Sequence, residues 1–473
     1  MKKSNQIQFI GMTGLWALLF WMSITDPFFW DGVQLGAKQA WFFYDHDFTR
    51  FWLPQEIDSG HPPFFGMYLA FWWTLLGTNL WLSHLAMLPF IGLFFYCSWQ
   101  LGNHYLGPNL AFALLALYTC DPTVLSQLFL LGPDAALLSF FLLAFLGHSK
   151  GNDWIQALGV LGLSLISMRG MMCAFALFLF EFIGYLRVYK GGWKWWWQKI
   201  RIYAPGVLLS LLFLWFHFRE KGWIGYHADS PWAWGFQKNT GEEVVWYLLL
   251  LGWRLLDFGR IFLWLGILLL LQSIPNIKKW PSHTLLALLL FLVLSWPFLI
   301  YQGLNQHRYL LPFYLVLHLV FLQQLQGLSW RPWKKYSLYI LVSLGLLSGH
   351  FWLYPSFVSQ GWDSTWAHRP YFQLRADAED YLARRAIPLS SVGAAFPAIG
   401  PLRYYNPAKT GPGFADKNEK NYDYYLVSNI MNDYSGRELN FIEANYQLLF
   451  HRQKRGIYVS VYGKKEKESD GSE

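Results

Sequence analysis

The segment between the first two apolar runs of the chain is rich in groups that can do chemistry. Residues 26–62 hold Asp31 directly after the first run, and His61 lies in the turn Gly-His-Pro-Pro-Phe before the second. A carboxylate at such an aqueous edge can act as a general base on an acceptor hydroxyl or amine, and burial against the aromatic residues 28–30 would raise the pKa of Asp31 towards a useful value. The ordinary alternative is a solvated aspartate that caps the following amphipathic helix.

The same segment offers ligands for a divalent metal. Asp45 and Asp47 flank His46, and carboxylate and imidazole groups are both common metal ligands. Three consecutive residues cannot all face one ion from regular structure, so solvated carboxylates are the stronger interpretation. The sequence therefore requires no cofactor and leaves a divalent metal open. His61 can donate a hydrogen bond to a phosphate group, and exposure to solvent explains it equally well.

Two arginines lie at the ends of later apolar runs. Arg169 lies in Ser-Met-Arg-Gly-Met-Met, and Arg308 follows His307 at the start of another run. Such an arginine can snorkel to lipid headgroups, but on the outer side of a membrane it is also suited to a bidentate phosphate clamp. Asp134 begins a further run, where capping a helix is its plain role. With Asp31 as the candidate catalytic residue, the candidate substrate-binding residues are Arg308, Arg169, His61, Asp134, Asp45, Asp47 and His307.

The composition places these residues in a membrane protein. Of the 473 residues, 54% are hydrophobic and only 14% are charged, against about 25% in a soluble protein. Residues 355–473 hold 29 of the 66 charged residues, so residues 1–354 are predicted to be membrane-embedded and 355–473 to form a water-facing domain. The net charge of +8 lies mainly in short loops between apolar runs, which indicates membrane topology and argues against nucleic acid as a partner.

Runs long enough to cross a membrane recur throughout the membrane-embedded part. They lie near residues 9–25, 64–78, 82–101, 106–119, 133–147, 154–168, 170–187, 202–218, 257–274, 283–301, 308–325 and 336–354. The N-terminus is predicted to be cytoplasmic as a retained signal-anchor. The basic loops that should also be cytoplasmic are 187–201, 276–280 and 331–336.

This topology gathers the ionisable span ends on one face. Asp31 and Asp134 are both extracytoplasmic only if 122–132, a short crossing or a broken helix, is counted as a span, which gives thirteen. The predicted class is therefore an α-helical polytopic membrane protein of about thirteen transmembrane helices, with a C-terminal extracytoplasmic α/β domain. Ionisable groups that converge on one face of a bundle are typical of a site assembled at the membrane boundary.

The C-terminal domain shows alternating helix and strand patterns. The patterns predict one amphipathic helix and three strands, the last of them at the sheet edge, over residues 371–387, 390–396, 422–429 and 455–465. The charged terminus from about residue 464 is predicted to be disordered.

The order of motifs along the chain resembles a known family. One span is followed by an acidic outer loop opened by Asp31, the turn Gly-His-Pro-Pro-Phe, the segment Gly-Pro-Asp-Ala-Ala-Leu-Leu at 132–138 and the segment His-Arg-Tyr-Leu-Leu-Pro at 307–312. This order is similar to that of polyprenyl-phosphate-sugar-dependent glycosyltransferases of the GT-C fold. The closest in pattern are the protein O-mannosyltransferases of family 39 and the lipid A aminoarabinose transferases. The resemblance covers about residues 9–354.

The resemblance implies a polyprenyl-phosphate sugar donor, inversion of the anomeric centre on transfer, and Asp31 as the catalytic residue. It also implies that the C-terminal domain, residues 355–473, either helps to bind acceptors or only shields the cavity. Two departures leave the sugar and the acceptor open, because Gly32 follows Asp31 and His61 stands where the aminoarabinose transferases have lysine. No nucleotide-binding motif is present, so the activated donor must come from the membrane.

The predicted function is transfer of a hexosyl or pentosyl group from a polyprenyl-phosphate donor to a lipid, glycan or protein acceptor, outside the inner membrane of the cell. Two rivals share the multispan design: a transporter or flippase of a lipid-linked substrate, and a polysaccharide polymerase or ligase. Two observations argue against a transporter. The charged residues cluster at one face of the membrane instead of its midplane, and no internal repeat is visible in the sequence.

Overall fold

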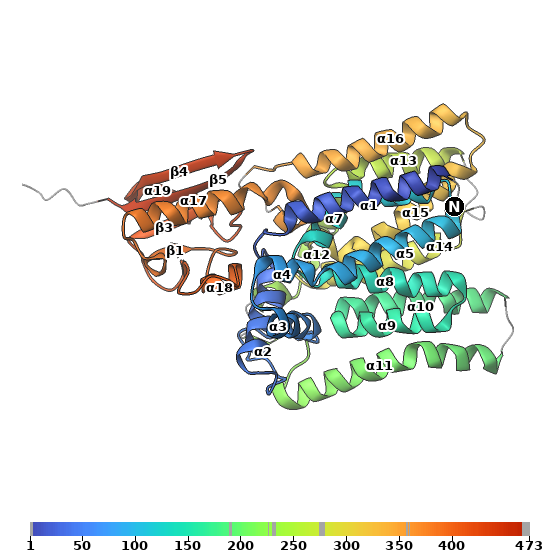
Figure 1. The fold of residues 1–473 in the computed structure, drawn as a ribbon, viewed down its shortest axis with the longest axis horizontal. Coiled ribbons are helices and arrows are strands. Elements are labelled where there is room, and N and C mark those ends of the chain that lie inside the picture. Colours follow the sequence, from blue (N-terminus) through green and yellow to red (C-terminus); the bar gives the residue numbers. More distant parts are fainter. Residues whose placement is uncertain are drawn as a thin grey trace, which may run out of the picture.

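The computed structural model shows a helical bundle with a small mixed domain at one end (Figure 1). The residues that it describes are 3–188, 192–225, 227–228, 233–273, 280–355, 358 and 360–465. We call the end of the bundle that carries residues 360–465 the domain end, and the N-terminus lies at the opposite end. The predicted class, an α-helical polytopic membrane protein with a C-terminal α/β domain, is confirmed.

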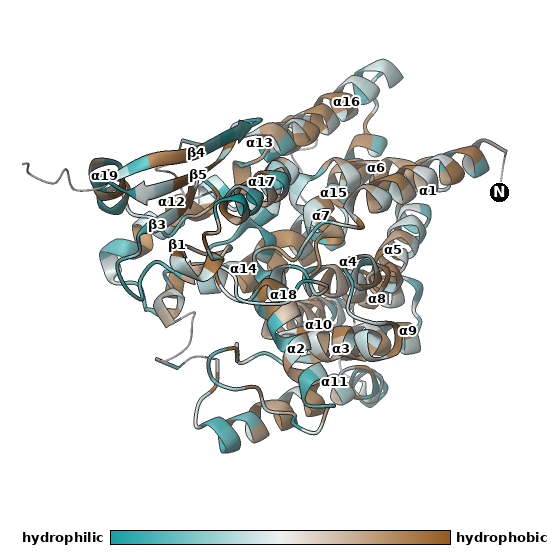
Figure 2. Cartoon of the chain, turned by 60° about the vertical axis from the view of Figure 1, so that its left-hand side comes forward, coloured by the Kyte–Doolittle hydropathy of each residue, from teal (hydrophilic) through white to brown (hydrophobic). Residues whose placement is uncertain are grey.

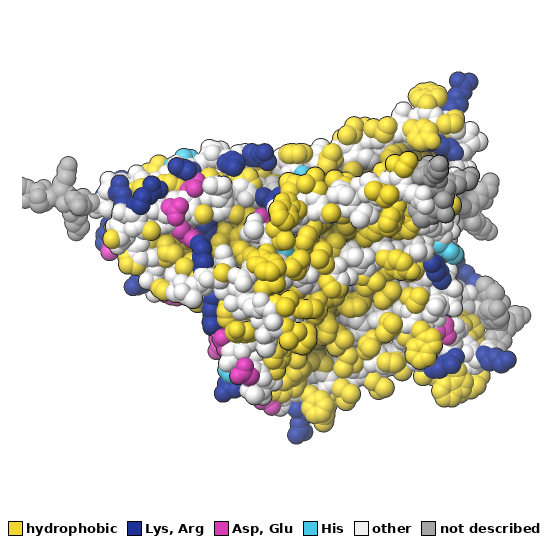
Figure 3. Space-filling model, viewed as in Figure 1, with side chains coloured by type: hydrophobic (Ala, Val, Ile, Leu, Met, Phe, Trp, Pro, Cys, Tyr) yellow, Lys and Arg dark blue, Asp and Glu magenta, His cyan; other side chains and the backbone are white. Residues whose placement is uncertain are grey.

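Long apolar helices make up the bundle. They are α1 (Lys3–Ser23), α5 (Leu88–Leu106), α8 (Asp134–Lys150), α9 (Asp153–Ile166), α10 (Met168–Val188), α11 (Trp193–Lys221), α13 (Arg260–Ser273), α14 (His283–Ile300), α15 (Leu311–Gly327) and α16 (Pro332–Ser348). Hydrophobic side chains cover the flank of the bundle in Figure 3. On α11, Leu208 and Trp215 are each more than half exposed. An apolar surface of this extent needs a bilayer to cover it.

Shorter helical elements complete the bundle. They are η1 (Gly32–Ala37), α2 (Lys38–Asp45), α3 (Phe64–Leu76), α4 (Leu80–Leu85), α6 (Ala111–Cys120), α7 (Pro122–Phe129), α12 (Gly241–Leu256) and η4 (His307–Leu310). Among the described helices, five are long and apolar enough to cross a membrane alone, and up to seven if two bent pairs are each counted as one span. The number of thirteen spans stays a prediction.

Those two pairs bend sharply inside the bundle, and one ion pair joins them. Helix α6 turns into α7 by 81°, and α12 turns into α13 by 86°. Asp121 at the first bend accepts from the N–H groups of Thr123 and Val124 and so caps α7. The same carboxylate accepts two hydrogen bonds, of 2.8 and 3.0 Å, from the buried Arg260 at the second bend. The eight residues of α7 rise only about 12 Å, less than the thickness of a bilayer core, and the counting of 122–132 as a span stays a prediction.

Close packing of α8 on α9 fixes the chain where candidate site residues lie. A Cβ at Gly147 would be 2.3 Å from the backbone nitrogen of Gln156, and one at Gly159 would be 2.3 Å from that of Ala144. Larger residues at either glycine would push the helices apart. Asp134 at the start of α8 is thereby held near the α9–α10 turn.

A five-stranded mixed sheet forms the C-terminal domain, in the order β2-β1-β3-β5-β4. The strands are β1 (Val392–Ala394), β2 (Ala415–Asp416), β3 (Tyr424–Ser428), β4 (Tyr446–Lys454) and β5 (Ile457–Lys464). Strand β1 is parallel to β2 and β3, whereas β5 is antiparallel to β3 and β4. The accompanying helices are α17 (Pro370–Arg384), α18 (Leu402–Tyr405) and α19 (Gly436–Asn445). Figure 2 shows more hydrophilic residues here than along the bundle helices.

The predicted helix and the first two predicted strands of this domain match α17, β1 and β3. The prediction that the last strand lies at the sheet edge is wrong, because β5 pairs on both sides and the unpredicted β4 forms the edge. Two predicted features fall outside the described residues. They are the lysines of the basic loop, within 274–279, and most of the disordered terminus, within 466–473.

The first loop contributes to the core of the C-terminal domain. Phe29 and Trp30 are buried in one cluster with Tyr371, Leu374 and other residues of the domain. The Phe29 ring stacks on the imidazole of His368 at 4.3 Å between centroids. The loop and the domain therefore pack as one unit at the domain end.

The structure sharpens one topology prediction. A cysteine placed at Lys420, in the C-terminal domain, should react with a membrane-impermeant maleimide added to intact spheroplasts, because the positive-inside rule puts the domain end outside. The native cysteines in the bundle are buried or half-buried, so background labelling should be low. A cysteine at the exposed Lys194, at the other end of the bundle, is the matched control and should react only after lysis. The opposite labelling pattern would overturn the predicted orientation.

Candidate active site

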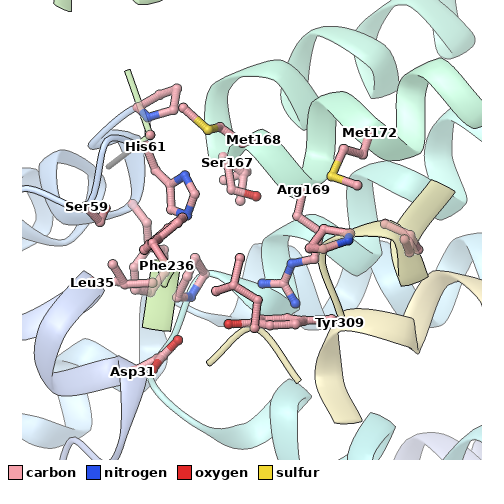
Figure 4. Close-up of a pocket in the computed structure, with 18 of the residues that line it drawn as sticks. Asp31, Leu35, Ser59, His61, Ser167, Met168, Arg169, Met172, Phe236 and Tyr309 are labelled. Carbon is pink, nitrogen blue, oxygen red and sulfur yellow. The ribbon is translucent and has the colours of Figure 1, made fainter. Parts of the chain in front are cut away.

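A cavity of about 370 Å³ opens at the domain end between the first loop, the α9–α10 turn and η4. Among the residues that line it are Asp31, Ser59, His61, Arg169 and Tyr309. Figure 4 shows Asp31, Arg169 and Tyr309 around a common space, with His61 across it. Three separate segments of the chain thus bring a carboxylate, a guanidinium, a phenol and an imidazole to one cavity.

Asp31 lies at the start of η1, just after the buried aromatic pair. Trp30 has φ of +51°, a left-handed conformation that a non-glycine residue adopts only when its surroundings hold it. The Asp31 side chain keeps 23% of its surface exposed, which leaves it accessible from the cavity, and its Oδ2 lies 2.5 Å from Nη2 of Arg308. Burial raises the pKa of Asp31, and the charge of Arg308 opposes that rise. The carboxylate is therefore a stronger base than one in water.

Arg308 lies behind the cavity wall and is surrounded by carboxylates. Its guanidinium is buried, with Nη2 on Asp31, Nη1 on Asp363, and Nε 3.8 Å from Asp134. It does not line the cavity. The Nη1 and Nη2 groups of Arg308, which would have to fork onto a phosphate in a clamp, face protein carboxylates in this structure.

Arg169 is the guanidinium that reaches the cavity. Its Nη2 lies 2.6 Å from Asp134, its Nη1 donates to the carbonyl of Arg308 at 3.1 Å, and it stacks over the Tyr309 ring at 4.9 Å. The tight α9–α10 turn places it there, since a Cβ at Gly170 would lie 2.1 Å from the carbonyl oxygen of Leu163. Asp134 is the first residue of α8, after the N-cap Pro133, and its carboxylate links Arg169 to Arg308.

His61 lies on a turn that is held in place by the contacts of Asp58. Gly60 has φ of +70° and donates its N–H to Asp58, which also lies 3.1 Å from Nε2 of His217 on α11. Within the described part of the chain, Nδ1 of His61 and the hydroxyl of Ser59 are buried without a hydrogen-bond partner. Buried polar atoms that line a cavity without a partner are available to a ligand.

Three other candidate residues do not reach the cavity. Asp45 pairs at 2.9 Å with Arg403 of the C-terminal domain, and the neighbouring Asp47 is exposed. His307 is fully buried and lies 2.6 Å from Asp257, away from the cavity lining. In the described ranges, no group of three or more His, Cys, Asp or Glu side chains is arranged to hold a metal ion, so Asp45 and Asp47 gain no third ligand.

Sequence reasoning missed two residues of the site. Asp363 follows the last apolar run and was assigned to the water-facing domain as a whole, although it contacts Arg308 inside the bundle. Tyr309 was treated only as a neighbour of Arg308, yet it lines the cavity and its ring lies beneath both arginines. For Tyr309 the signal was available, because the motif that contains Arg308 begins an apolar run.

Solved structures share this architecture over nearly the whole chain. ArnT from Cupriavidus metallidurans in the apo state aligns with a TM-score of 0.56 and 12% identity, over 96% of this chain and 97% of that one. The same protein bound to undecaprenyl phosphate gives a TM-score of 0.53 and 13% identity over the same shares. The chain has the GT-C fold.

A third GT-C structure extends the similarity. The arabinofuranosyltransferase AftD from Mycobacteria aligns over 100% of this chain and 40% of its own, with a TM-score of 0.50 and 13% identity. No protein-family model matches the sequence, and no curated protein matches it. The likeness to GT-C proteins is thus one of fold, carried by the arrangement of helices and not by overall identity.

The acid stability of the chain should depend on His61. Burial, followed by the charge of Arg169, lowers the pKa of His61 to about 4 from 6.5. Below pH 6.5 the unfolded chain takes up a proton that the folded chain refuses, so stability falls between pH 6.5 and 4, by up to roughly 3 kcal/mol. His61→Gln should flatten this part of the curve of unfolding temperature against pH. Ser59→Ala changes a neighbouring cavity side chain that does not ionise and should leave the slope unchanged. Equal slopes for wild type and His61→Gln would contradict the assignment.

Proposed function

We propose that this protein is a membrane glycosyltransferase that moves a sugar from a polyprenyl-phosphate donor to an acceptor on the extracytoplasmic side of the inner membrane. The observation that supports the proposal is that the Asp31 carboxylate and the Arg169 guanidinium line the same cavity. Such a pair suits a reaction in which an acceptor loses a proton while a phosphate leaves.

The proposed step is a single displacement at the anomeric carbon. The acceptor oxygen or nitrogen attacks that carbon, the bond from the carbon to the phosphate oxygen breaks, and polyprenyl phosphate leaves with the bonding electrons. Asp31 takes the proton of the acceptor. One displacement of this kind inverts the anomeric centre.

Asp31 is suited to the role of base because of two opposed influences. Burial raises its pKa and makes the carboxylate a better proton acceptor, while Arg308 favours the ionised form that must be present before the reaction. General bases work best when their pKa lies near the pH of the reaction.

Arg169 lines the cavity and can stabilise the leaving group. The donor phosphate gains negative charge as the sugar leaves, so a cation beside it stabilises the transition state more than the ground state. Tyr309 and the neutral His61 can add hydrogen bonds, because the phenol and one imidazole nitrogen can each donate. We therefore assign the phosphate to Arg169, with His61 and Tyr309 beside it.

An apolar groove beside the cavity supports a lipid donor. It has a volume of about 460 Å³ and lies between the first loop, α3, α9 and α11, lined by residues such as Trp52, Met67 and Leu212. Pro62 lines both the groove and the cavity, so a polyprenyl chain in the groove would bring its phosphate to Arg169. The GT-C relative bound to undecaprenyl phosphate is consistent with this donor class.

The acceptor is a lipid, glycan or protein, and the assay must distinguish transfer from its rivals. Membranes that contain the protein would receive a labelled polyprenyl-phosphate sugar. Release of free polyprenyl phosphate together with a labelled product of fixed size supports the transferase. Movement of the intact lipid across the membrane supports a transporter, and a ladder of products supports a polymerase.

Asp31→Asn should lower turnover by about 10²- to 10⁴-fold, the usual contribution of a general base, because the amide cannot accept the proton. Binding of polyprenyl phosphate should persist, since Arg169 is unchanged. The matched control is Asp45→Asn on the same loop, whose partner Arg403 lies outside the cavity lining, and it should turn over normally. Near-normal turnover by Asp31→Asn would remove Asp31 from the role of base.

Arg169→Lys and Arg308→Lys should fail in different ways. Lysine at 169 keeps the positive charge in the cavity but offers a single nitrogen, which cannot hold Asp134 and also reach a phosphate, so kcat/KM for the donor should fall about 10- to 100-fold. Lysine at 308 cannot serve Asp31, Asp363 and Asp134 together, so it should destabilise the fold by about 2–3 kcal/mol. An Arg169→Lys enzyme with wild-type kcat/KM would place the phosphate elsewhere.

A further inference from the structure

The C-terminal segment 360–369 inserts a carboxylate into the bundle. The backbone carbonyl of Asp363 accepts from the hydroxyl of Ser126 at 2.7 Å and from the amide of Gln127 at 2.9 Å. The Gln127 amide also lies 3.1 Å from the Asp363 carboxylate, which accepts a hydrogen bond from Arg308. Asp363 is buried. The short helix α7 therefore fixes this carboxylate against Arg308.

Asp363 competes with Asp31 for one cation. Arg308 donates Nη2 to Asp31 at 2.5 Å and Nη1 to Asp363, and Asp134 lies 3.8 Å from its Nε. Arg169, the other cation of the group, pairs with Asp134 at 2.6 Å. These five groups carry a net charge of −1 when all are ionised. Asp31 therefore shares its counter-ion and never holds Arg308 alone.

We propose that Asp363 is a positioning residue for the glycosyl transfer proposed above: by holding one side of Arg308, it keeps that arginine from forming a complete ion pair with Asp31. A carboxylate in a complete bidentate pair is a poor proton acceptor, because accepting a proton would break the pair. The C-terminal domain thus supplies a group that tunes the base in the bundle. The inference rests on the proposed function, since it assumes that Asp31 acts as the base.

The charges that face Asp31 give the sign of the expected effect. They are Arg308 and Arg169, which lower its pKa, and Asp363 and Asp134, which raise it, in addition to the larger effect of burial. Removing the charge of Asp363 takes away one of the carboxylates that raise the pKa and frees Arg308 for Asp31. The pKa of Asp31 should therefore fall.

The test is the pH profile of polyprenyl-phosphate release by the purified full-length protein. Asp363→Asn should move the acid limb of kcat/KM to lower pH by about one unit, with a smaller kcat on the alkaline side because the base is weaker. Asp363→Glu keeps the charge and should return the limb towards the wild-type position.

The matched control is Asp26→Asn, which removes another contact between the first loop and the C-terminal domain. Asp26 pairs with Arg369 at 3.0 Å, whereas the ion pairs of Arg308 within the described ranges are with Asp31, Asp134 and Asp363. A residue that only docks the domain would lower activity without moving the acid limb, as Asp26→Asn should. If the limb of Asp363→Asn stays at the wild-type position, the inference about Asp363 is overturned.

Two further arms keep the outcomes separate. If Asp363→Asn does not fold, Gln127→Ala takes its place, because losing the amide hydrogen bond loosens the Asp363 carboxylate against Arg308 and should move the limb in the same direction by less. If the acid limb of kcat/KM for Gln127→Ala stays at the wild-type pH, the inference is also overturned. If the wild-type protein releases no polyprenyl phosphate, the proposed function is contradicted. If the enzyme is active but the acid limb does not move in Asp363→Asn, only the role of Asp363 is contradicted.

Discussion

The buried guanidinium of Arg308 is the interaction on which the domain end depends. Three carboxylates converge on it, from the first loop, the start of α8 and the C-terminal segment. None of them would be stable at this depth without a cation, and removing one partner of a buried pair typically costs about 3–5 kcal/mol. Asp31 and Arg308 lie 277 residues apart in the chain, so one side chain makes the loop, the bundle and the domain a single structure.

The same constraint operates deeper in the bundle. Arg260 and Asp121 are fully buried and join two helix breaks by a bidentate pair, with the Tyr314 ring 4.0 Å from the guanidinium. An apolar bundle tolerates such breaks only where the freed backbone and the charges find partners. The break before α7 matters for the site, because the helix that it creates carries Ser126 and Gln127, which hold Asp363.

The sequence revealed the residues whose position follows from membrane topology. Asp31, His61 and Arg169 were found because each ionisable group lies at an end of an apolar run on one predicted face. Asp363 was missed because its partner comes from a distant helix, and no local pattern distinguishes it from other charged residues of its domain. Strand β4, Tyr-Gln-Leu-Leu-Phe-His-Arg-Gln-Lys, was missed because a bulge between Leu448 and Phe450 breaks the alternation that marks a strand.

The aromatic pair of the first loop has a consequence for biogenesis. Phe29 and Trp30 complete a hydrophobic core whose other residues, apart from Leu130, lie in the C-terminal domain, and Arg369 of that domain contacts Asp26 across 343 residues of chain. At about 5–20 residues per second, a ribosome needs roughly 20–70 s to make the intervening chain. For that interval Phe29 and Trp30 have no C-terminal domain to pack against, and the core of the domain is incomplete until the domain contacts the loop. Maturation of the whole chain must therefore end with this docking, and a prematurely terminated chain leaves two large aromatic side chains open to quality control.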